Sequence, residues 1–182
     1  MKYPSRYQEI VKTLLAGKFI IDTDENAPFP EIRDHEAFYR NFFKTTFNCS
    51  LEGSGSFYYL TSGQTQETLS RDFLLFLSVL DYEYQNRDKG IVEEAKEGTF
   101  SIEEVIQAIE HSSKKKVLRN TKVYVTRDKK KKLDVKAFLD KWERRNLIHY
   151  VDHGTKFRFT KAIKLFIDAA LDLSKESITH EE

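Results

Sequence analysis

One pattern occurs twice along this chain of 182 residues: a helix with one apolar face, two short aromatic strands around a small turn, then another amphipathic helix. The second copy is the clearer one. Four apolar residues in the helix over residues 133–145 have the i, i+3, i+4, i+7 spacing of one buried stripe: Val135, Phe138, Leu139 and Trp142. Alternation then predicts a hairpin of residues 148–151 and 156–159, and Thr160 is a candidate cap for the closing helix.

The first copy begins at Asp34, a candidate N-cap, and continues into a helix with buried aromatic residues at 38, 39, 42 and 43. Its hairpin pairs alternating residues Phe47, Cys49 and Leu51 with Phe57 and Tyr59, and Gly53-Ser54-Gly55 is expected to supply positive φ angles at the turn. A helix over residues 67–84 closes the unit. The pattern predicts a mainly α fold with small β-hairpin wings, of the α+β class, in two tandem winged-helix domains.

This pattern predicts four segments along the chain. Residues 1–88 form an N-terminal winged-helix domain for dimerisation or partner binding, 89–98 a linker, 99–173 a basic C-terminal winged-helix domain and 174–182 a short polar tail. Capping boxes at residues 5–8 and 101–104 mark two more helix starts, and residues 22–30 are expected to be a surface loop. The helix over 69–84 is apolar on two faces, so it is either a core helix or packs against the second domain or a second subunit.

Positive charge is concentrated in residues 111–145, which hold 14 Lys or Arg against four Asp or Glu. That segment carries +10, so the rest of the chain carries −9 in a protein whose net charge is +1. Such a segment is either a solvated lysine-rich loop or a surface for duplex DNA. Because lysines dominate, we expect contacts to the DNA backbone and little sequence readout, from Lys114, Lys115, Lys116, Arg119, Lys122, Lys129, Lys130, Lys131, Lys132, Lys141, Arg144, Arg145, Lys156 and Arg158.

Motifs for catalysis and cofactor binding are missing from the sequence. It contains no Walker loop, Gly-rich dinucleotide turn or Cys-rich metal spacing, so we expect no enzymatic activity, no cofactor and no metal. His149 and His153 flank the second turn without a carboxylate or thiol to complete a zinc site. The single Cys49 rules out an internal disulfide. With no signal peptide or membrane span in view, the expected location is the cytoplasm.

Seven stretches, taken in their order along the chain, match the pattern of one known family. They are Ala16-Gly17-Lys18-Phe19-Ile20, His35-Glu36-Ala37-Phe38, Gly55-Ser56-Phe57-Tyr58-Tyr59-Leu60, the Leu69 to Tyr84 helix, Gly98-Thr99-Phe100-Ser101, Trp142-Glu143-Arg144-Arg145-Asn146-Leu147-Ile148 and Gly154-Thr155-Lys156-Phe157-Arg158-Phe159-Thr160. Over nearly its whole length the chain thus resembles the MukE/MksE-type accessory subunits of bacterial condensins, which are built from tandem winged-helix domains.

The resemblance implies a homodimer, held mainly through the first domains, that binds a kleisin and through it an SMC ATPase, which hydrolyses the ATP. It implies a nucleoid-associated scaffold in chromosome condensation and partition. On this basis the interface with a second subunit or the kleisin is expected on Phe73, Leu74, Phe76, Leu77, Leu80 and Tyr84. The short tail suits the MksE branch. The alternatives are a winged-helix transcription regulator with a defined operator, or the equivalent subunit of an SMC system directed against plasmids.

Overall fold

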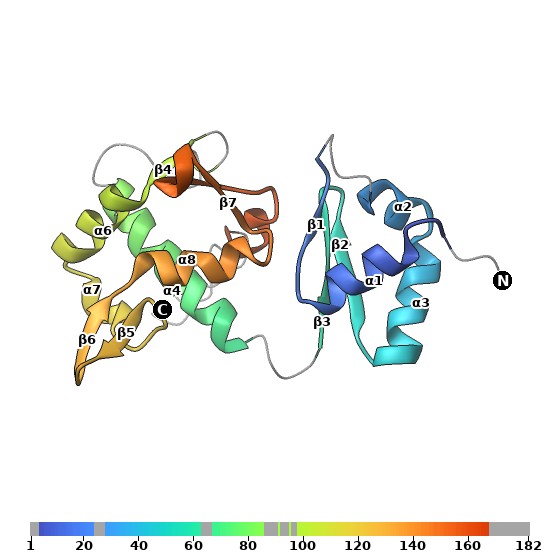
Figure 1. Ribbon diagram of the computed structural model, residues 1–182, viewed down its shortest axis with the longest axis horizontal. Helices are drawn as coiled ribbons and strands as arrows, with labels where there is room; N and C mark the ends of the chain where they lie inside the picture. Colours follow the sequence, from blue (N-terminus) through green and yellow to red (C-terminus); the bar gives the residue numbers. More distant parts are fainter. Residues whose placement is uncertain are drawn as a thin grey trace, which may run out of the picture.

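The computed structural model describes residues 4–23, 28–62, 67–85, 91, 95 and 98–167. Two groups of helices and strands lie side by side (Figure 1). The first unit consists of α1 (Tyr7–Leu15), β1 (Ile20–Ile21), α2 (Pro28–Asp34), α3 (Glu36–Phe47), β2 (Ser50–Ser54) and β3 (Phe57–Thr61). The second unit consists of α4 (Glu67–Gln85), β4 (Phe100–Ser101), α6 (Ile102–His111), α7 (Lys115–Leu118), β5 (Tyr124–Arg127), β6 (Lys130–Leu133), α8 (Val135–Glu143), β7 (Ile148–Val151), the 3-10 turn η1 (Asp152–Gly154) and β8 (Lys156–Phe159).

Both units repeat one order of elements: a helix, a short strand, two helices and a two-stranded hairpin. Their antiparallel sheets have matching strand orders, β1-β3-β2 in the first unit and β4-β8-β7 in the second. In the second unit, α7 and the β5–β6 hairpin are inserted between α6 and α8. The mixed α+β class with small hairpins is therefore confirmed, and the repeat is longer than the sequence pattern suggested.

Alternation correctly predicted the hairpin of the second unit but not that of the first, where Phe47 ends α3 and Leu51 pairs with Leu60, on the face opposite to Phe57 and Tyr59. Ile148 pairs with Phe159 and Tyr150 with Phe157, so these four side chains share one face of the sheet. Phe157 and Phe159 are buried, and each packs its ring against Phe100 of β4, with centroids 5.4 and 5.1 Å apart. The third strand, β4, pairs with β8 and was not predicted because two residues are too few to show a period.

Helix α4 belongs to the core of the second unit. Its Phe73 ring stacks on Trp142 with centroids 4.1 Å apart, and its Phe76 ring lies 5.1 Å from that of Phe138. Asp72, also on α4, accepts a hydrogen bond from the backbone N–H of Lys122. The expectation that this helix closes the first unit is therefore corrected, whereas its predicted packing against the second half of the chain is confirmed. Periodicity reveals an apolar face but not which core will cover it.

Strand β3 is enclosed on both faces. Tyr58 and Leu60 face the core formed with α1, α2 and α3, in which Ile10, Phe29 and Phe43 are fully buried. The opposite face, with Phe57 and Tyr59, joins the cluster that extends into the second unit. Because side chains alternate along a strand, this one element links the two cores.

Hydrogen bonds to the backbone on either side of β1 also join the two units. The N–H of Phe19 donates to the carbonyl of Arg145 over 2.9 Å, and the Nδ2 of Asn146 donates to the carbonyl of Phe19 over 2.8 Å. Nearby, the Nζ of Lys161 donates to the carbonyl of Asp22 over 2.8 Å. Asn146 has φ 61° just after α8, a conformation that asparagine tolerates better than most residues. These bonds fix the loop after α8 against the first unit.

Of the two helix starts predicted from capping boxes, one has the predicted side-chain cap. Ser101 is the N-cap of α6, and its side chain accepts from the N–H of Glu104 over 3.4 Å. Ser5 instead donates its hydroxyl to the carboxylate of Glu31, and the start of α1 has no side-chain cap. Glu31 also accepts from the backbone N–H of Arg6 and from the Tyr39 hydroxyl, so this end of α1 is tied to α2 and α3.

The other two predicted caps are wrong. Asp34 is the last residue of α2, and His35 precedes α3 without a side-chain cap. Thr160 donates its hydroxyl to the carbonyl of Asn146 over 2.8 Å. This side chain therefore binds the loop after α8 and does not cap the helix of residues 163–167.

The predicted loop at 22–30 is corrected in part, since α2 begins at Pro28. Proline fits there because the first-turn N–H groups of a helix have no partner within it.

Gly53 is needed for space rather than for a positive φ angle. Among the described glycines, only Gly17 and Gly154 have positive φ, which corrects the expected role of Gly53 and Gly55. A Cβ on Gly53 would lie 2.3 Å from Cδ1 of Tyr58, which is buried on the paired strand and donates its hydroxyl to Glu36. The close approach of the two strands therefore requires glycine at this position.

We predict that Gly53→Ala lowers the free energy of unfolding by about 1–3 kcal/mol, because the Tyr58 ring has to shift within a packed core. Urea denaturation followed by circular dichroism measures the change. Gly55→Ala is the matched control, since nothing lies within 4 Å of a Cβ at that position. Equal midpoints for the two variants would contradict the steric role of Gly53.

Candidate nucleic-acid interface

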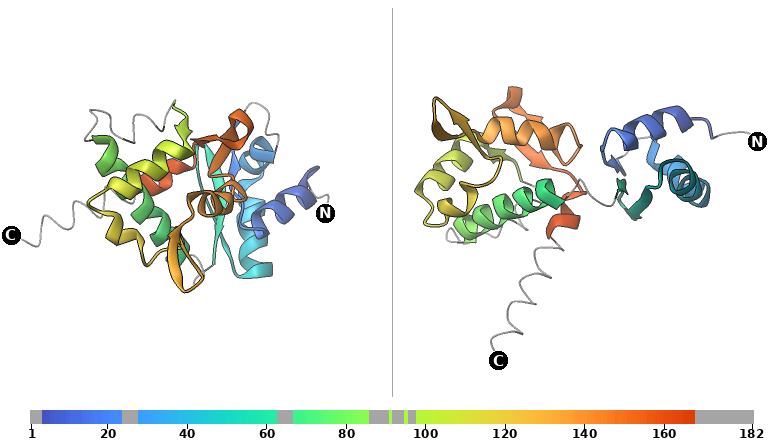
Figure 2. Two further views of the ribbon diagram at one scale, coloured as in Figure 1. Left: turned by 60° about the vertical axis from the view of Figure 1, so that its left-hand side comes forward. Right: turned by 90° about the horizontal axis from the view of Figure 1, so that it is seen from below.

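The predicted DNA-contacting residues lie on three features of the second unit. The first is α7 with its flanking residues: Lys114, Lys115, Lys116, Arg119 and Lys122. The second is the β5–β6 hairpin, with Lys129, Lys130, Lys131 and Lys132. The third is the end of α8 with the β7–β8 wing: Lys141, Arg144, Arg145, Lys156 and Arg158. The hairpin and α7 lie at the end of the second unit that is remote from the first unit (Figures 1 and 2).

The β5–β6 hairpin replaces the basic loop that the sequence predicted. Its two central residues, Asp128 and Lys129, have φ angles of 52° and 61°, as a tight two-residue hairpin turn requires. Arg127 pairs with Lys130, Thr126 with Lys131 and Val125 with Lys132. The turn residues, Asp128 and Lys129, include neither glycine nor asparagine, so the sequence did not predict a hairpin here. The run of β-branched and aromatic residues Val123, Tyr124 and Val125 was the available signal.

The pairing divides the lysines of this hairpin between its two faces. Lys131 shares a face with Tyr124 and Leu133, which are partly buried against the core. Its Nζ donates to the carbonyl of Arg119 over 2.7 Å and to Oδ1 of Asn120 over 3.2 Å. Lys130 and Lys132 lie on the opposite face and are exposed. Lys131 thus fastens the hairpin to the end of α7, and Lys130 and Lys132 point to solvent.

The basic residues around α7 are nearly all exposed. Lys114 places its Nζ 5.4 Å from the ring centre of Tyr82, and Lys115 donates to the carbonyl of Glu110 over 3.0 Å. Lys116, Arg119 and Lys122 extend from the surface between α6 and the hairpin. The sequence therefore correctly predicted a basic surface in this part of the chain.

The wing and α8 carry acidic as well as basic side chains. Lys156 forms a 2.8 Å ion pair with Asp152, and hydrogen bonding to that carboxylate raises the pKa of Lys156. Asp140 accepts from the Tyr150 hydroxyl over 2.7 Å, and Glu143 is exposed on the same helix. The exposed Arg158 faces solvent from β8. The net positive charge of this surface is therefore lower than its count of lysines and arginines suggested.

Arg145 is placed differently from the other predicted residues. It is half-buried, its guanidinium carbon lies 5.8 Å from the ring centre of Trp142, and burial lowers its pKa. Lys136 was not among the predicted contact residues, although helical spacing places it outside the buried stripe. It is exposed on the first turn of α8, with its Nζ 4.7 Å from the ring centre of Tyr150.

Most of the predicted partner residues on α4 are covered by the chain itself. Phe73, Phe76 and Leu80 have no exposed surface, and Leu77 is 5% exposed. Leu74 and Tyr84 are partly buried. Among the predicted partner residues, Leu74 and Tyr84 therefore keep the most surface for a partner, and the exposed Tyr82 lies on the same helix.

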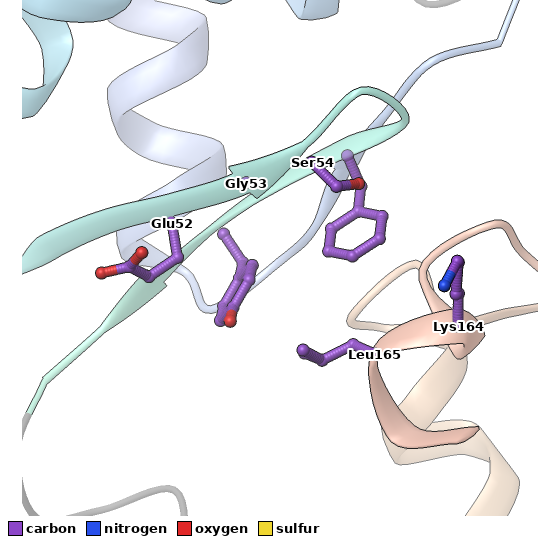
Figure 3. A pocket seen from close by; sticks show the side chains of 7 residues that line it. Glu52, Gly53, Ser54, Lys164 and Leu165 are labelled. Carbon is purple, nitrogen blue, oxygen red and sulfur yellow. The ribbon is translucent and has the colours of Figure 1, made fainter. Parts of the chain in front are cut away.

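No catalytic constellation appears in the part of the chain that the structure describes. An open hollow at the unit junction is lined by Glu52, Gly53, Ser54, Phe57, Tyr59, Lys164 and Leu165 (Figure 3). The hollow lies between the β2–β3 hairpin and residues 164 and 165 of the second unit, and its lining includes neither a cysteine nor a histidine. Within the described ranges, no three His, Cys, Asp or Glu side chains gather as metal ligands, and no helix combines the length and apolarity needed to cross a bilayer.

Comparison with known proteins gives one result of wide coverage. A family model described as condensin complex protein MksE matches residues 5–171. The match covers both units, from α1 through β8. No curated protein matches the chain.

Proposed function

The chain belongs to the MksE family of condensin complex proteins, and on this premise we propose that it is a non-catalytic subunit of an SMC complex. In this proposal it binds a kleisin and, through the kleisin, the SMC ATPase that hydrolyses ATP. It acts as a homodimer on the nucleoid, in chromosome condensation and partition. The observation that carries the proposal is the family match over residues 5–171, which covers nearly every described residue.

We further propose that each unit is a winged helix. Both have the order helix, strand, helix, helix, hairpin, and in both the short strand pairs with the last strand. On this assignment α3 and α8 are the equivalent helices that precede each wing. The first domain then ends at β3, and α4 opens the second domain rather than closing the first, which modifies the division at residues 88–98 that the sequence favoured.

The second domain is proposed to contact duplex DNA without sequence preference. Its exposed positively charged side chains are mostly lysines, a residue type that typically contacts DNA phosphates. Few side chains suited to bidentate recognition of bases accompany them. The first unit has no comparable excess of positive charge. We assign it to the homodimer and the kleisin.

Affinity purification of the full-length tagged chain from its native cells tests the complex. We expect an SMC protein and a kleisin to be recovered together in stoichiometric amounts, and we expect the SMC protein to be lost when the kleisin is deleted, because the kleisin connects the two. Recovery of the chain with neither protein would contradict the proposal.

DNA binding separates this proposal from that of a transcription regulator. A condensin subunit should bind unrelated duplexes with similar affinity, and that affinity should fall steeply with salt as counterions are displaced. A regulator should favour one operator by a factor of about 1,000 or more. Footprinting on genomic fragments measures the difference, and protection of one discrete sequence would favour the regulator.

A further inference from the structure

We infer that this chain contacts the DNA backbone through the β5–β6 hairpin and α7, rather than through α8 and the β7–β8 wing that a winged helix usually lays on DNA. The inference rests on the proposed DNA contact of the second domain. It concerns which surface of that domain meets the duplex. Three observations carry it: the distribution of acidic side chains, the faces of the hairpin and the attachment of Lys131.

The distribution of acidic side chains separates the two surfaces. Residues 114–132 contain ten Lys or Arg and one acidic residue, Asp128, at the hairpin turn. Residues 135–159 contain six Lys or Arg and three acidic residues, Asp140, Glu143 and Asp152. These three lie on α8 and the wing, which are the elements that would face the phosphates in the usual mode. A carboxylate facing phosphate is repelled, so the usual surface is the poorer anion-binding one.

Pairing within the wing further weakens its positive charge. Lys156 is held by Asp152 over 2.8 Å, so contact with a phosphate would have to replace an existing ion pair. In contrast, among the described carboxylates none lies within ion-pair distance of Lys129, Lys130 or Lys132. Binding a phosphate therefore breaks no ion pair between these three ammonium groups and a described carboxylate.

The shape of the hairpin suits a groove of the duplex. The major groove, about 12 Å wide, admits a two-stranded β-ribbon. Lys130 and Lys132 lie on the outer face, two residues apart and so about 7 Å apart along the strand, and Lys129 is at the tip. Lys131, directed to Arg119 and Asn120, holds this ribbon against α7 so that Lys116, Arg119 and Lys122 extend the same basic end of the domain.

A matched set of full-length variants tests this assignment with two unrelated 30-base-pair duplexes in fluorescence anisotropy. The hairpin variant carries Lys129→Ala, Lys130→Ala and Lys132→Ala. We expect at least about tenfold weaker binding to both duplexes at low salt, and a salt slope shallower by about three, one for each lost phosphate contact. All three residues are exposed, so the thermal midpoint should stay at the wild-type value.

Two other triple variants remove the same charge elsewhere. Lys12→Ala, Lys18→Ala and Lys44→Ala lie on the first unit, where all three side chains are exposed, and should weaken binding less than about threefold. Lys141→Ala, Arg144→Ala and Arg158→Ala lie on α8 and the wing and should have a clearly smaller effect than the hairpin variant.

The outcomes distinguish this inference from the proposal on which it rests. A larger loss from the α8 and wing variant than from the hairpin variant would overturn the inference while the DNA contact stands. No binding of either duplex by the wild-type chain at low salt would overturn both. If the hairpin variant keeps its DNA affinity but fails to capture the kleisin, the hairpin binds an acidic protein segment, and the assignment to DNA is wrong.

Discussion

Replacing Phe76 with aspartate is expected to unfold the chain. The side chain has no exposed surface, and its ring lies 5.1 Å from that of Phe138 and 6.4 Å from that of Phe73. Removal of a buried phenylalanine costs about 3–5 kcal/mol, and the unpaired carboxylate adds a desolvation penalty. Their sum approaches the whole stability of a small domain, about 5–15 kcal/mol. Far-UV circular dichroism and thermal unfolding of the purified variant measure the loss.

Tyr82→Asp is the matched control for this variant. It places the same carboxylate on the same helix, but Tyr82 is 40% exposed and contacts Lys114 from the surface. We expect a change below about 1 kcal/mol, because an exposed charge remains hydrated. If the Phe76→Asp variant unfolded at the same temperature as the wild type, α4 would not pack as described. Its apolar face would then be available as the partner surface that the sequence suggested.

The second prediction concerns which C-terminal fragment of the chain can fold on its own. A fragment of residues 62–182 retains α4, whereas a fragment of residues 99–182 lacks it. We expect the longer fragment to unfold cooperatively and the shorter one to lack a stable fold. In the shorter fragment, Trp142 loses the stacked Phe73, Phe138 loses Phe76, and Phe100 loses Tyr84, whose ring centroid is 5.5 Å away.

Thermal unfolding and the dispersion of amide NMR signals compare the two fragments. The longer one exposes the surface that Phe19, Ile21 and Phe57 cover in the intact chain, so its midpoint should lie below that of the full-length protein. A cooperative transition in the shorter fragment at the same midpoint would contradict the assignment of α4 to the second domain.

Much of the local structure could be predicted from spacing alone. The stripe of Val135, Phe138, Leu139 and Trp142 is buried, the facing pairs of the β7–β8 hairpin have the predicted register, and Ser101 caps α6. Each of these depends on residues close together in the sequence, where periodicity and side-chain hydrogen bonding to nearby backbone decide the outcome. The excess of basic residues on the second half of the chain was equally visible.

Features that depend on distant residues were predicted poorly. Ser5 and Thr160 have the residue type of a cap, but each hydroxyl found a partner elsewhere in the fold, Glu31 for one and Asn146 for the other. The glycine at position 53 is fixed by the ring of Tyr58 on the neighbouring strand. Of the four consecutive lysines, all of them exposed, Lys131 is placed by the pairing of β5 with β6 on the face that meets the end of α7, whereas Lys130 and Lys132 lie on the opposite face.

The sequence by itself determined the helical faces, the register of the β7–β8 hairpin, the basic segment and the resemblance to a family, because these depend on local order and composition. Only the tertiary structure decided that α4 fills the core of the second unit and that β3 is buried on both faces. The physical reason is that an apolar face or a charge has no preferred partner until the chain brings distant elements together.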